Sequence, residues 1–173
     1  AKAAGLWNLF LPGHSPSESA HGAGLSNLDY APIAELTGRS LFAPEIFNCS
    51  APDTGNMETL AKYGTAAQQQ QWLEPLMAGE IRSGFAMTEP DGGAGADPLL
   101  LKTRAVPDGN GYVINGRKWL ITGAEGAAFG IIMARTGDGP GDCTMFLTEL
   151  PNPAFKISRV LGTMDSSFMG GHA

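Results

Sequence analysis

The sequence predicts an α+β fold, in which a helical N-terminal part is followed by an antiparallel β-barrel. Two observations support this prediction. Apolar residues recur with helical spacing up to about residue 81, and short apolar runs separated by glycine- and proline-rich turns follow from residue 82. Evenly spaced short strands with such turns are typical of barrels. We therefore expect a helical part over residues 1–81 and a β part over residues 82–173.

The composition suits a folded chain and argues against several classes of protein. Of the 173 residues, 43% are hydrophobic and 16% are charged, which is enough apolar material for a core. The net charge is −6, and the 11 lysines and arginines form no cluster, so no nucleic-acid surface is expected. No apolar run approaches the roughly 18 residues of a membrane span, and the first ten residues lack a signal-peptide pattern.

Cysteine and histidine show no metal-binding spacing. Cys49 and Cys143 lie far apart in the sequence, and so do His14, His21 and His172. We expect the two cysteines to be reduced core thiols of a cytosolic or organellar-matrix protein.

The first helix signal lies in residues 26–37, where apolar residues fall near one helical face. Ser26 or Asn27 can act as its N-cap. Pro44 disfavours a helical conformation at the residue before it, so this helix should end ahead of it. A second, short helix is expected over residues 44–49.

A longer helix is expected over residues 65–78. Thr65 and Gln68 have the spacing of a capping box at its start. Pro75 should bend or tighten the helix, and Gly79 is suited to its C-cap.

The β part contains seven candidate strands, and Asn115-Gly116 has the composition of a two-residue hairpin turn. The strands are expected over residues 83–88, 99–106, 112–116, 118–124, 129–136, 143–150 and 155–160.

Two of these segments, "FAMT" and "WLIT", carry a threonine after an apolar run, at Thr88 and Thr122. A hydroxyl there, with unpaired backbone amides beside it, can bind the heteroatoms of a flat aromatic ligand. Alternatively, both threonines satisfy local backbone groups. Known catalytic motifs are absent from the sequence, and "GAGADP" does not match the dinucleotide-binding fingerprint.

The residues around these threonines resemble a known family. "FAMTEP" (85–90) and "NGRKWLITGA" (115–124), preceded by the helix of residues 63–81, closely resemble the flavin-binding β-domain of the acyl-CoA dehydrogenases. "FNCSAPDTGNMETLAKYG" (47–64), with "GLWNLFLP" (5–12) upstream, is similar to the long-chain subgroup that is fused to kinase-like domains in animals. The resemblance covers nearly all of the chain.

The resemblance implies three domains: an N-terminal helical domain, a middle β-barrel and a C-terminal four-helix bundle. This chain resembles the later part of the first and most of the second, and the bundle is missing. We therefore expect a piece of a longer protein, with residues 1–81 in the first domain and residues 82–173 in an incomplete second one. The 173-residue piece alone is expected to bind cofactor weakly and to be inactive.

The resemblance also implies FAD as the cofactor. The backbone around Phe85 and Met87 and the Thr88 hydroxyl would meet the pyrimidine side of the flavin, and Thr122 would lie near N5, the hydride acceptor. The glycine-rich loop after Pro90 would border the CoA moiety. The implied cofactor-binding residues are Phe85, Ala86, Met87, Thr88, Leu120, Ile121 and Thr122, and the implied substrate-binding residues are Gly95 and Ala96.

The implied reaction is the α,β-dehydrogenation of an acyl-CoA thioester. The family places the catalytic base in the bundle, so no catalytic residue is assigned here, and Glu89 is expected to be structural. Electron-transfer flavoprotein is the implied partner, and a homodimer or homotetramer the implied assembly. The implied location is the cytoplasm of a bacterium, or the mitochondrial or peroxisomal matrix of a eukaryote.

Two departures from the family pattern leave alternatives open. Leu120 stands where many members carry a tryptophan, and strand alternation would turn the neighbouring Trp119 to the opposite face. Ala96 stands where a serine often contacts the ligand. A flavin oxidase or monooxygenase of the same superfamily, acting on a substrate without CoA, and a catalytically inert module are therefore the alternative hypotheses.

Overall fold

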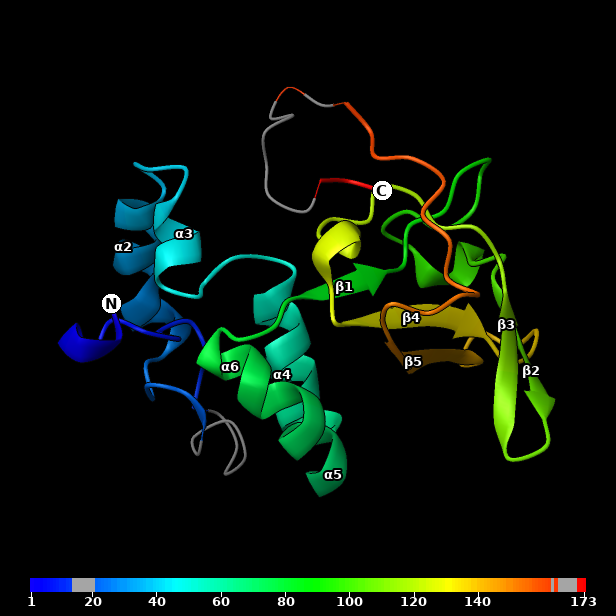
Figure 1. Cartoon of the computed structure of the whole chain (residues 1–173), viewed down its shortest axis with the longest axis horizontal. Coiled ribbons are helices and arrows are strands. Elements are labelled where there is room, and N and C mark those ends of the chain that lie inside the picture. Colours follow the sequence, from blue (N-terminus) through cyan, green and yellow to red (C-terminus); the bar gives the residue numbers. More distant parts are fainter. Residues whose placement is uncertain (14–20, 163, 165–170) are drawn as a thin grey trace. The chain divides into compact units, whose positions relative to one another are not determined.

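The structure, a computed structural model, describes residues 1–13, 21–162, 164 and 171–173. Its contacts divide the chain into two compact units, Ala1–Arg82 and Ser83–Ala173. Helices build the first unit, and the described strands all lie in the second (Figure 1). Among the described residues, no helix has the length and apolar character needed to cross a bilayer.

Short helices enclose a small apolar core in the first unit. The side chains of Leu11, Met57, Leu60, Leu73 and Leu76 are almost completely buried there. The helices are η1 (Lys2–Ala4), α2 (Asn27–Thr37), α3 (Ala43–Ile46), α4 (Asp53–Tyr63), α5 (Ala66–Gln68), η2 (Gln69–Leu73) and α6 (Glu74–Ala78).

Helix α2 confirms the prediction for residues 26–37. Ser26 is the N-cap, and its hydroxyl and the Asp29 carboxylate form a capping box. The expected apolar face is not buried, however, since Leu28 is 84% exposed. Helix α3 confirms the short helix before Cys49, whereas α4 was not predicted as a helix.

The predicted helix over residues 65–78 forms with a change of pitch in its middle. Thr65 and Gln68 make the expected capping box, and Gly79 ends the helix in a left-handed conformation. Residues Gln69–Leu73 are wound as a π-helix, so of the two outcomes expected at Pro75, a bend or a tightening, the tightening is wrong. Proline lacks an N–H, and its ring displaces the carbonyl four residues earlier, which favours local widening over tightening.

Arg82, the last residue of the first unit, joins two of its helices by ion pairs. Its guanidinium lies 2.7 Å from a carboxylate oxygen of Glu45 and 2.8 Å from one of Asp53. Asp53 is 1% exposed, so its charge needs this counterion.

The described part of the second unit contains one sheet of five strands. Strand β4 lies between β1 and β5 (Figure 1). The strands are β1 (Ser83–Ala86), β2 (Arg104–Asp108), β3 (Gly111–Asn115), β4 (Phe129–Arg135) and β5 (Cys143–Glu149), and the short turns are η3 (Pro98–Leu100) and η4 (Ala124–Gly126).

Strand β4 organises this sheet. It pairs along its whole length with antiparallel β5 on one edge. On its other edge, parallel β1 ends with Ala86 opposite Ile132, and β2 begins with Arg104 opposite Arg135. All residues of β4 except Met133 are buried, as expected for an apolar strand covered on both faces.

The α+β class is confirmed. Within the described residues the sheet does not close into a barrel, and β1 and β2 pair with β4 in parallel, whereas the sequence analysis expected antiparallel strands. Residues 118–124 and 155–160 are not strands. Leu120 has a φ of 60° and Gly123 a φ of 76°, and these left-handed conformations interrupt the extended backbone. The expected strand over residues 99–106 begins only at Arg104, after η3.

The predicted hairpin turn at Asn115-Gly116 is also wrong. Strands β2 and β3 pair so that Asp108 faces Gly111, which puts the two-residue turn at Gly109-Asn110. Gly109 has a φ of 56°, the conformation that glycine adopts without strain.

We predict that Ile131→Ala in β4 lowers the free energy of unfolding by about 2–5 kcal/mol, because it removes three buried carbons and leaves a cavity. Ile131 is 1% exposed. The control is Val106→Ala in β2, where the side chain is 57% exposed and the expected change is below about 0.5 kcal/mol. Urea unfolding of both variants checks this, and equal losses would contradict the central position of β4.

Candidate functional site

The two predicted cofactor-binding segments lie side by side. The Trp119 N–H donates to the Thr88 carbonyl oxygen at 2.9 Å. Ala86 and Ile121, one from each segment, belong to the same buried apolar cluster as Ala124 and Ile132. The fold therefore brings together two segments that lie about thirty residues apart in the sequence.

The predicted residues differ in what they can offer a ligand. Ala86 is 2% exposed and Ile121 is 5% exposed, so their side chains are committed to the core and only their backbone is available. Phe85 and Met87 are half-buried. Leu120 is 48% exposed and keeps its side chain outside the core.

The left-handed conformation of Leu120 changes the expectation for Trp119. A residue with a branched side chain is strained at a φ of 60°, and such strain is common at functional sites. Because the segment is not a regular strand, the predicted alternation of faces does not apply. The Trp119 ring is half-buried, and the Arg159 guanidinium lies 5.8 Å from its centroid.

The two threonines have different surroundings. The Thr88 hydroxyl is half-buried and has no hydrogen-bond partner among the described residues. The Thr122 hydroxyl lies 2.9 Å from Nδ1 of His172. The Thr88 hydroxyl can therefore bond to a ligand or to water, because a polar group shielded from bulk solvent is favoured when it has a hydrogen-bond partner.

The predicted substrate-binding residues lie in the loop between β1 and β2. Gly95 and Ala96 are exposed, whereas Ala94 is fully buried and its carbonyl accepts from the Glu89 N–H at 2.7 Å. A Cβ on Gly93 would lie 2.6 Å from the Cβ of Glu89, so this close approach requires glycine.

Glu89 is the most extensively bonded side chain in this region. It is 7% exposed and accepts hydrogen bonds from the Lys102 N–H at 2.6 Å, the Thr103 N–H at 2.9 Å and the Thr103 hydroxyl. The Lys118 ammonium lies 2.9 Å from the same carboxylate and also donates to the Met87 carbonyl at 2.9 Å. A Cβ on Gly116 would overlap Thr103, so this packing also requires glycine.

This environment fixes the charge of Glu89. Burial alone would raise the pKa of Glu89, but the hydrogen bonds from Thr103, Lys118 and the two amides lower it to about 2. Burial lowers the pKa of Lys118, against the opposing effect of the Glu89 carboxylate. A carboxylate that holds its charge so firmly is a poor proton acceptor, which agrees with a structural role for Glu89.

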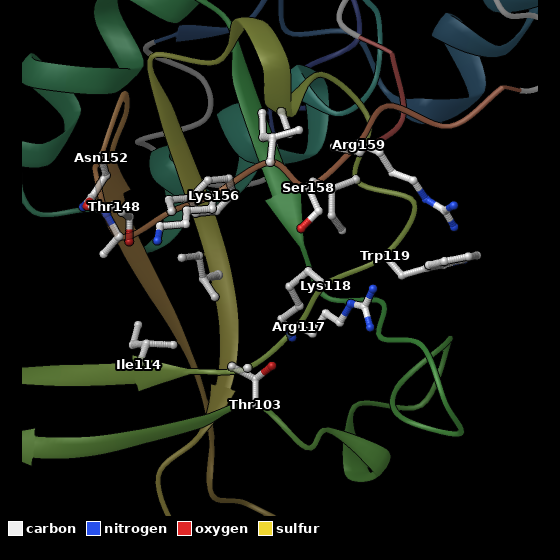
Figure 2. Close-up of a pocket in the computed structure, with 18 of the residues that line it drawn as sticks. Thr103, Ile114, Arg117, Lys118, Trp119, Thr148, Asn152, Lys156, Ser158 and Arg159 are labelled. Carbon is white, nitrogen blue, oxygen red and sulfur yellow. Dashed lines mark hydrogen bonds between the residues drawn. The ribbon is translucent and has the colours of Figure 1, made fainter.

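A cavity of about 970 Å³ is lined in part by residues of the 116–121 segment. Ile114, Ile121, Ile132 and Phe155 contribute apolar side chains to it, and none of its described lining residues is acidic. Thr148 and Lys156 lie toward one end and Trp119 and Arg159 toward the other (Figure 2). Ile121 alone among the predicted cofactor-binding residues lines this cavity, and residues of the two expected strands that do not form, 118–124 and 155–160, contribute to its lining.

Both halves of the chain match domains of known proteins. The N-terminal domain of acyl-CoA dehydrogenases matches residues 1–80, and the middle domain of the same enzymes matches residues 84–170. The chain belongs to the acyl-CoA dehydrogenase family. The resemblance seen in the sequence is thereby confirmed. Among the described residues no group of side chains could hold a metal ion.

Relatives in this family are longer than the chain. Acyl-CoA dehydrogenase family member 11 of Gallus gallus is 46% identical over 181 residues, which cover 99% of this chain and 22% of that protein. A solved acyl-CoA dehydrogenase homologue from Mycobacterium abscessus is 46% identical, with a TM-score of 0.89 over 99% of this chain and 42% of its own. The chain therefore spans less than half of either relative.

Two further solved structures contain the flavin. Glutaryl-CoA dehydrogenase from Mycobacterium smegmatis, in complex with FADH2, is 28% identical with a TM-score of 0.67, over 92% of this chain and 39% of its own. PigA with FAD and proline is 30% identical with a TM-score of 0.75, over 94% of this chain and 42% of its own. FAD is therefore the cofactor that this fold binds in its relatives.

Sequence reasoning missed three partners in this site. It assigned no role to Lys118 or Thr103, which bind Glu89, and it could not derive one for His172, which contacts Thr122. A lysine directly before the apolar run "WLI" was a usable signal, because a charged residue beside a core segment needs a counterion. No sequence signal pairs residues 122 and 172.

We predict that Glu89→Gln lowers the free energy of unfolding at pH 7 by about 2–4 kcal/mol, because Lys118 then lacks its buried counterion. The control, Asp91→Asn, removes an exposed carboxylate two residues away. Because the folded-state pKa of Glu89 is about 2, its contribution is present above the unfolded-state pKa and is lost as the pH falls from about 5 toward 2.

Urea unfolding between pH 7 and pH 3 measures both effects. The difference in stability between wild type and Glu89→Gln should shrink as the pH falls. A difference that stays constant over this range would contradict the lowered pKa of Glu89.

Proposed function

We propose that the full-length protein is an FAD-dependent acyl-CoA dehydrogenase that introduces an α,β double bond into an acyl-CoA thioester. Membership of the family supports a dehydrogenase-type function. The observation that carries the finer proposal is the pairing of the Thr88 and Thr122 segments. The Thr88 hydroxyl, which has no hydrogen-bond partner among the described residues, thereby lies beside a strained backbone at Leu120.

In this proposal the chain holds the flavin from two adjacent segments. The backbone of Phe85 and Met87 and the hydroxyl of Thr88 bind the pyrimidine side, and Thr122 lies beside N5. Ala86 and Ile121 anchor these segments in the core, and the exposed Leu120 contacts the ring system. Bound FAD supplies the acceptor for the two electrons and the β-hydrogen that leave the substrate.

The remaining chemistry is positioning and proton removal. Gly95 and Ala96, exposed on the loop after β1, border the CoA moiety in this proposal, where glycine lets backbone approach a long ligand. Glu89 does not act as the base in this proposal, because its carboxylate accepts four hydrogen bonds, one of which belongs to the ion pair with Lys118. We assign the catalytic base to a carboxylate outside residues 1–173.

A second candidate function keeps the flavin and changes the substrate. Ala96 replaces the serine that often contacts the ligand in this family, and one solved relative holds proline with its FAD. An oxidase or monooxygenase acting on a substrate without CoA fits both observations. An inert module that retains the fold is the third candidate.

The partners and the location are part of the same proposal. Electron-transfer flavoprotein reoxidises the flavin, and the protein assembles as a homodimer or homotetramer. It acts in the bacterial cytoplasm, or in the mitochondrial or peroxisomal matrix of a eukaryote.

The proposal is tested by adding substrates to the full-length, flavin-loaded protein without oxygen. Acyl-CoA thioesters of graded chain length should bleach the visible absorbance of the flavin, and the product should be the enoyl-CoA. Bleaching by free amino or carboxylic acids but by no thioester would favour the second candidate. If the protein took up no FAD, the inert module would be the remaining candidate.

We predict that Thr88→Val weakens FAD binding by about two- to tenfold, because the variant keeps the shape of the side chain and loses one hydrogen bond. The matched control is Thr144→Val on β5, where the threonine is exposed and outside the proposed site. Titration of the apo-protein with FAD measures both dissociation constants. An unchanged affinity in Thr88→Val, or an equal loss in the control, would remove Thr88 from the site.

A further inference from the structure

Thr122 and His172 form a facing pair between two segments fifty residues apart. They are joined by an antiparallel bridge, and the Thr122 Oγ1 lies 2.9 Å from the Nδ1 of His172. Side chains of directly opposed residues project from the same face, so this contact follows from the pairing of the backbones.

The backbone around His172 is held on both sides. Ile121 and Ala173 exchange two hydrogen bonds of 2.9 and 3.0 Å, and the Gly123 N–H donates to the Gly171 carbonyl at 3.1 Å. On the other side, the Leu161 N–H donates to the His172 carbonyl at 2.8 Å. The imidazole is thus presented to Thr122 from a fixed position and not from a free loop.

A threonine hydroxyl carries one proton and two acceptor lone pairs, and it rotates to suit its partners. A single well-placed partner therefore decides in which direction the hydroxyl donates and where its lone pairs point. Nδ1 of a histidine can take either role, because a neutral imidazole has one protonated and one unprotonated nitrogen.

We propose that His172 is a positioning residue that directs the Thr122 hydroxyl toward N5 of the flavin. This inference rests on the proposed function, which places Thr122 beside N5. When Nδ1 carries a proton, it donates to Thr122, and the hydroxyl proton is free to donate to the bare N5 of oxidised flavin. When Nδ1 is unprotonated, it accepts from Thr122, and a hydroxyl lone pair faces the N5–H of reduced flavin.

The pair therefore supplies a hydrogen bond to either oxidation state of the cofactor. Without His172, the Thr122 hydroxyl could still rotate to bond either oxidation state of the flavin, but it would lose rotational entropy each time it did so. His172 replaces this freedom with two defined arrangements, and a pre-oriented hydrogen bond binds more tightly because less entropy is lost.

The test uses the full-length, FAD-loaded protein and a matched pair of variants. His172→Phe keeps a planar ring but removes the nitrogen, whereas His172→Asn keeps a polar atom bonded to Cγ, where Nδ1 stands. Thr122→Val and the double variant Thr122→Val/His172→Phe complete a double-mutant cycle. The two readouts are the FAD dissociation constant and the 15N NMR shift of FAD labelled at N5, which reports the hydrogen bond directly.

We expect His172→Phe to weaken FAD binding by about two- to tenfold and to move the N5 shift in the same direction as Thr122→Val. His172→Asn should recover most of both effects. In the Thr122→Val background, His172→Phe should change neither readout further, because its target hydroxyl is gone.

Two results would overturn the inference while leaving the proposed function intact. One is an N5 shift and an FAD affinity that are unchanged in His172→Phe. The other is an effect of His172→Phe that persists in the Thr122→Val background, which would mean that His172 supports the fold and not the hydroxyl. If the wild-type protein bound no FAD, the proposed function would fail, and this inference with it.

Discussion

The buried Glu89 carboxylate is the interaction on which the arrangement of the second unit depends. It reaches the backbone where the β1–β2 loop returns to the sheet, through the amides of Lys102 and Thr103, and it holds Lys118 of the segment that follows β3. Lys118 in turn binds the Met87 carbonyl. One ionised side chain thus connects three stretches of backbone that are distant in the sequence.

The geometry of the candidate site follows from this connection. The Trp119 N–H reaches the Thr88 carbonyl next to the Lys118 contact, so the Thr88 and Thr122 segments are aligned by the same cluster. Burying a charge is expensive unless it is fully paired, and Glu89 is paired with both backbone amides and a cation. The buried ion pair therefore fixes how the two segments align. Apolar packing, which has no directional contacts, would not fix this alignment by itself.

Patterns carried in short stretches were predictable, and pairings between distant stretches were not. The N-cap at Ser26, the capping box at Thr65 and the buried strand β4 follow from local spacing, and the family resemblance follows from short motifs such as "FAMTEP". The left-handed Leu120, the parallel pairing of β1 with β4 and the contact of Thr122 with His172 depend on tertiary context. Propensity and alternation are weak guides where such contacts decide the backbone conformation.

Because β1 and β2 both pair with the same edge of β4, the length of the loop between them does not affect the register of either strand. The chain leaves the sheet after Ala86, opposite Ile132, and returns at Arg104, opposite Arg135, only three positions further along β4. Hydrogen bonds from the Lys102 and Thr103 amides to Glu89 hold the two ends of this loop together. At the exposed positions of this loop, around Gly95 and Ala96, residues can be inserted or removed at little cost in closure entropy and without shifting any strand. The loop is therefore a place where ligand preference can diverge among homologues while the scaffold stays unchanged.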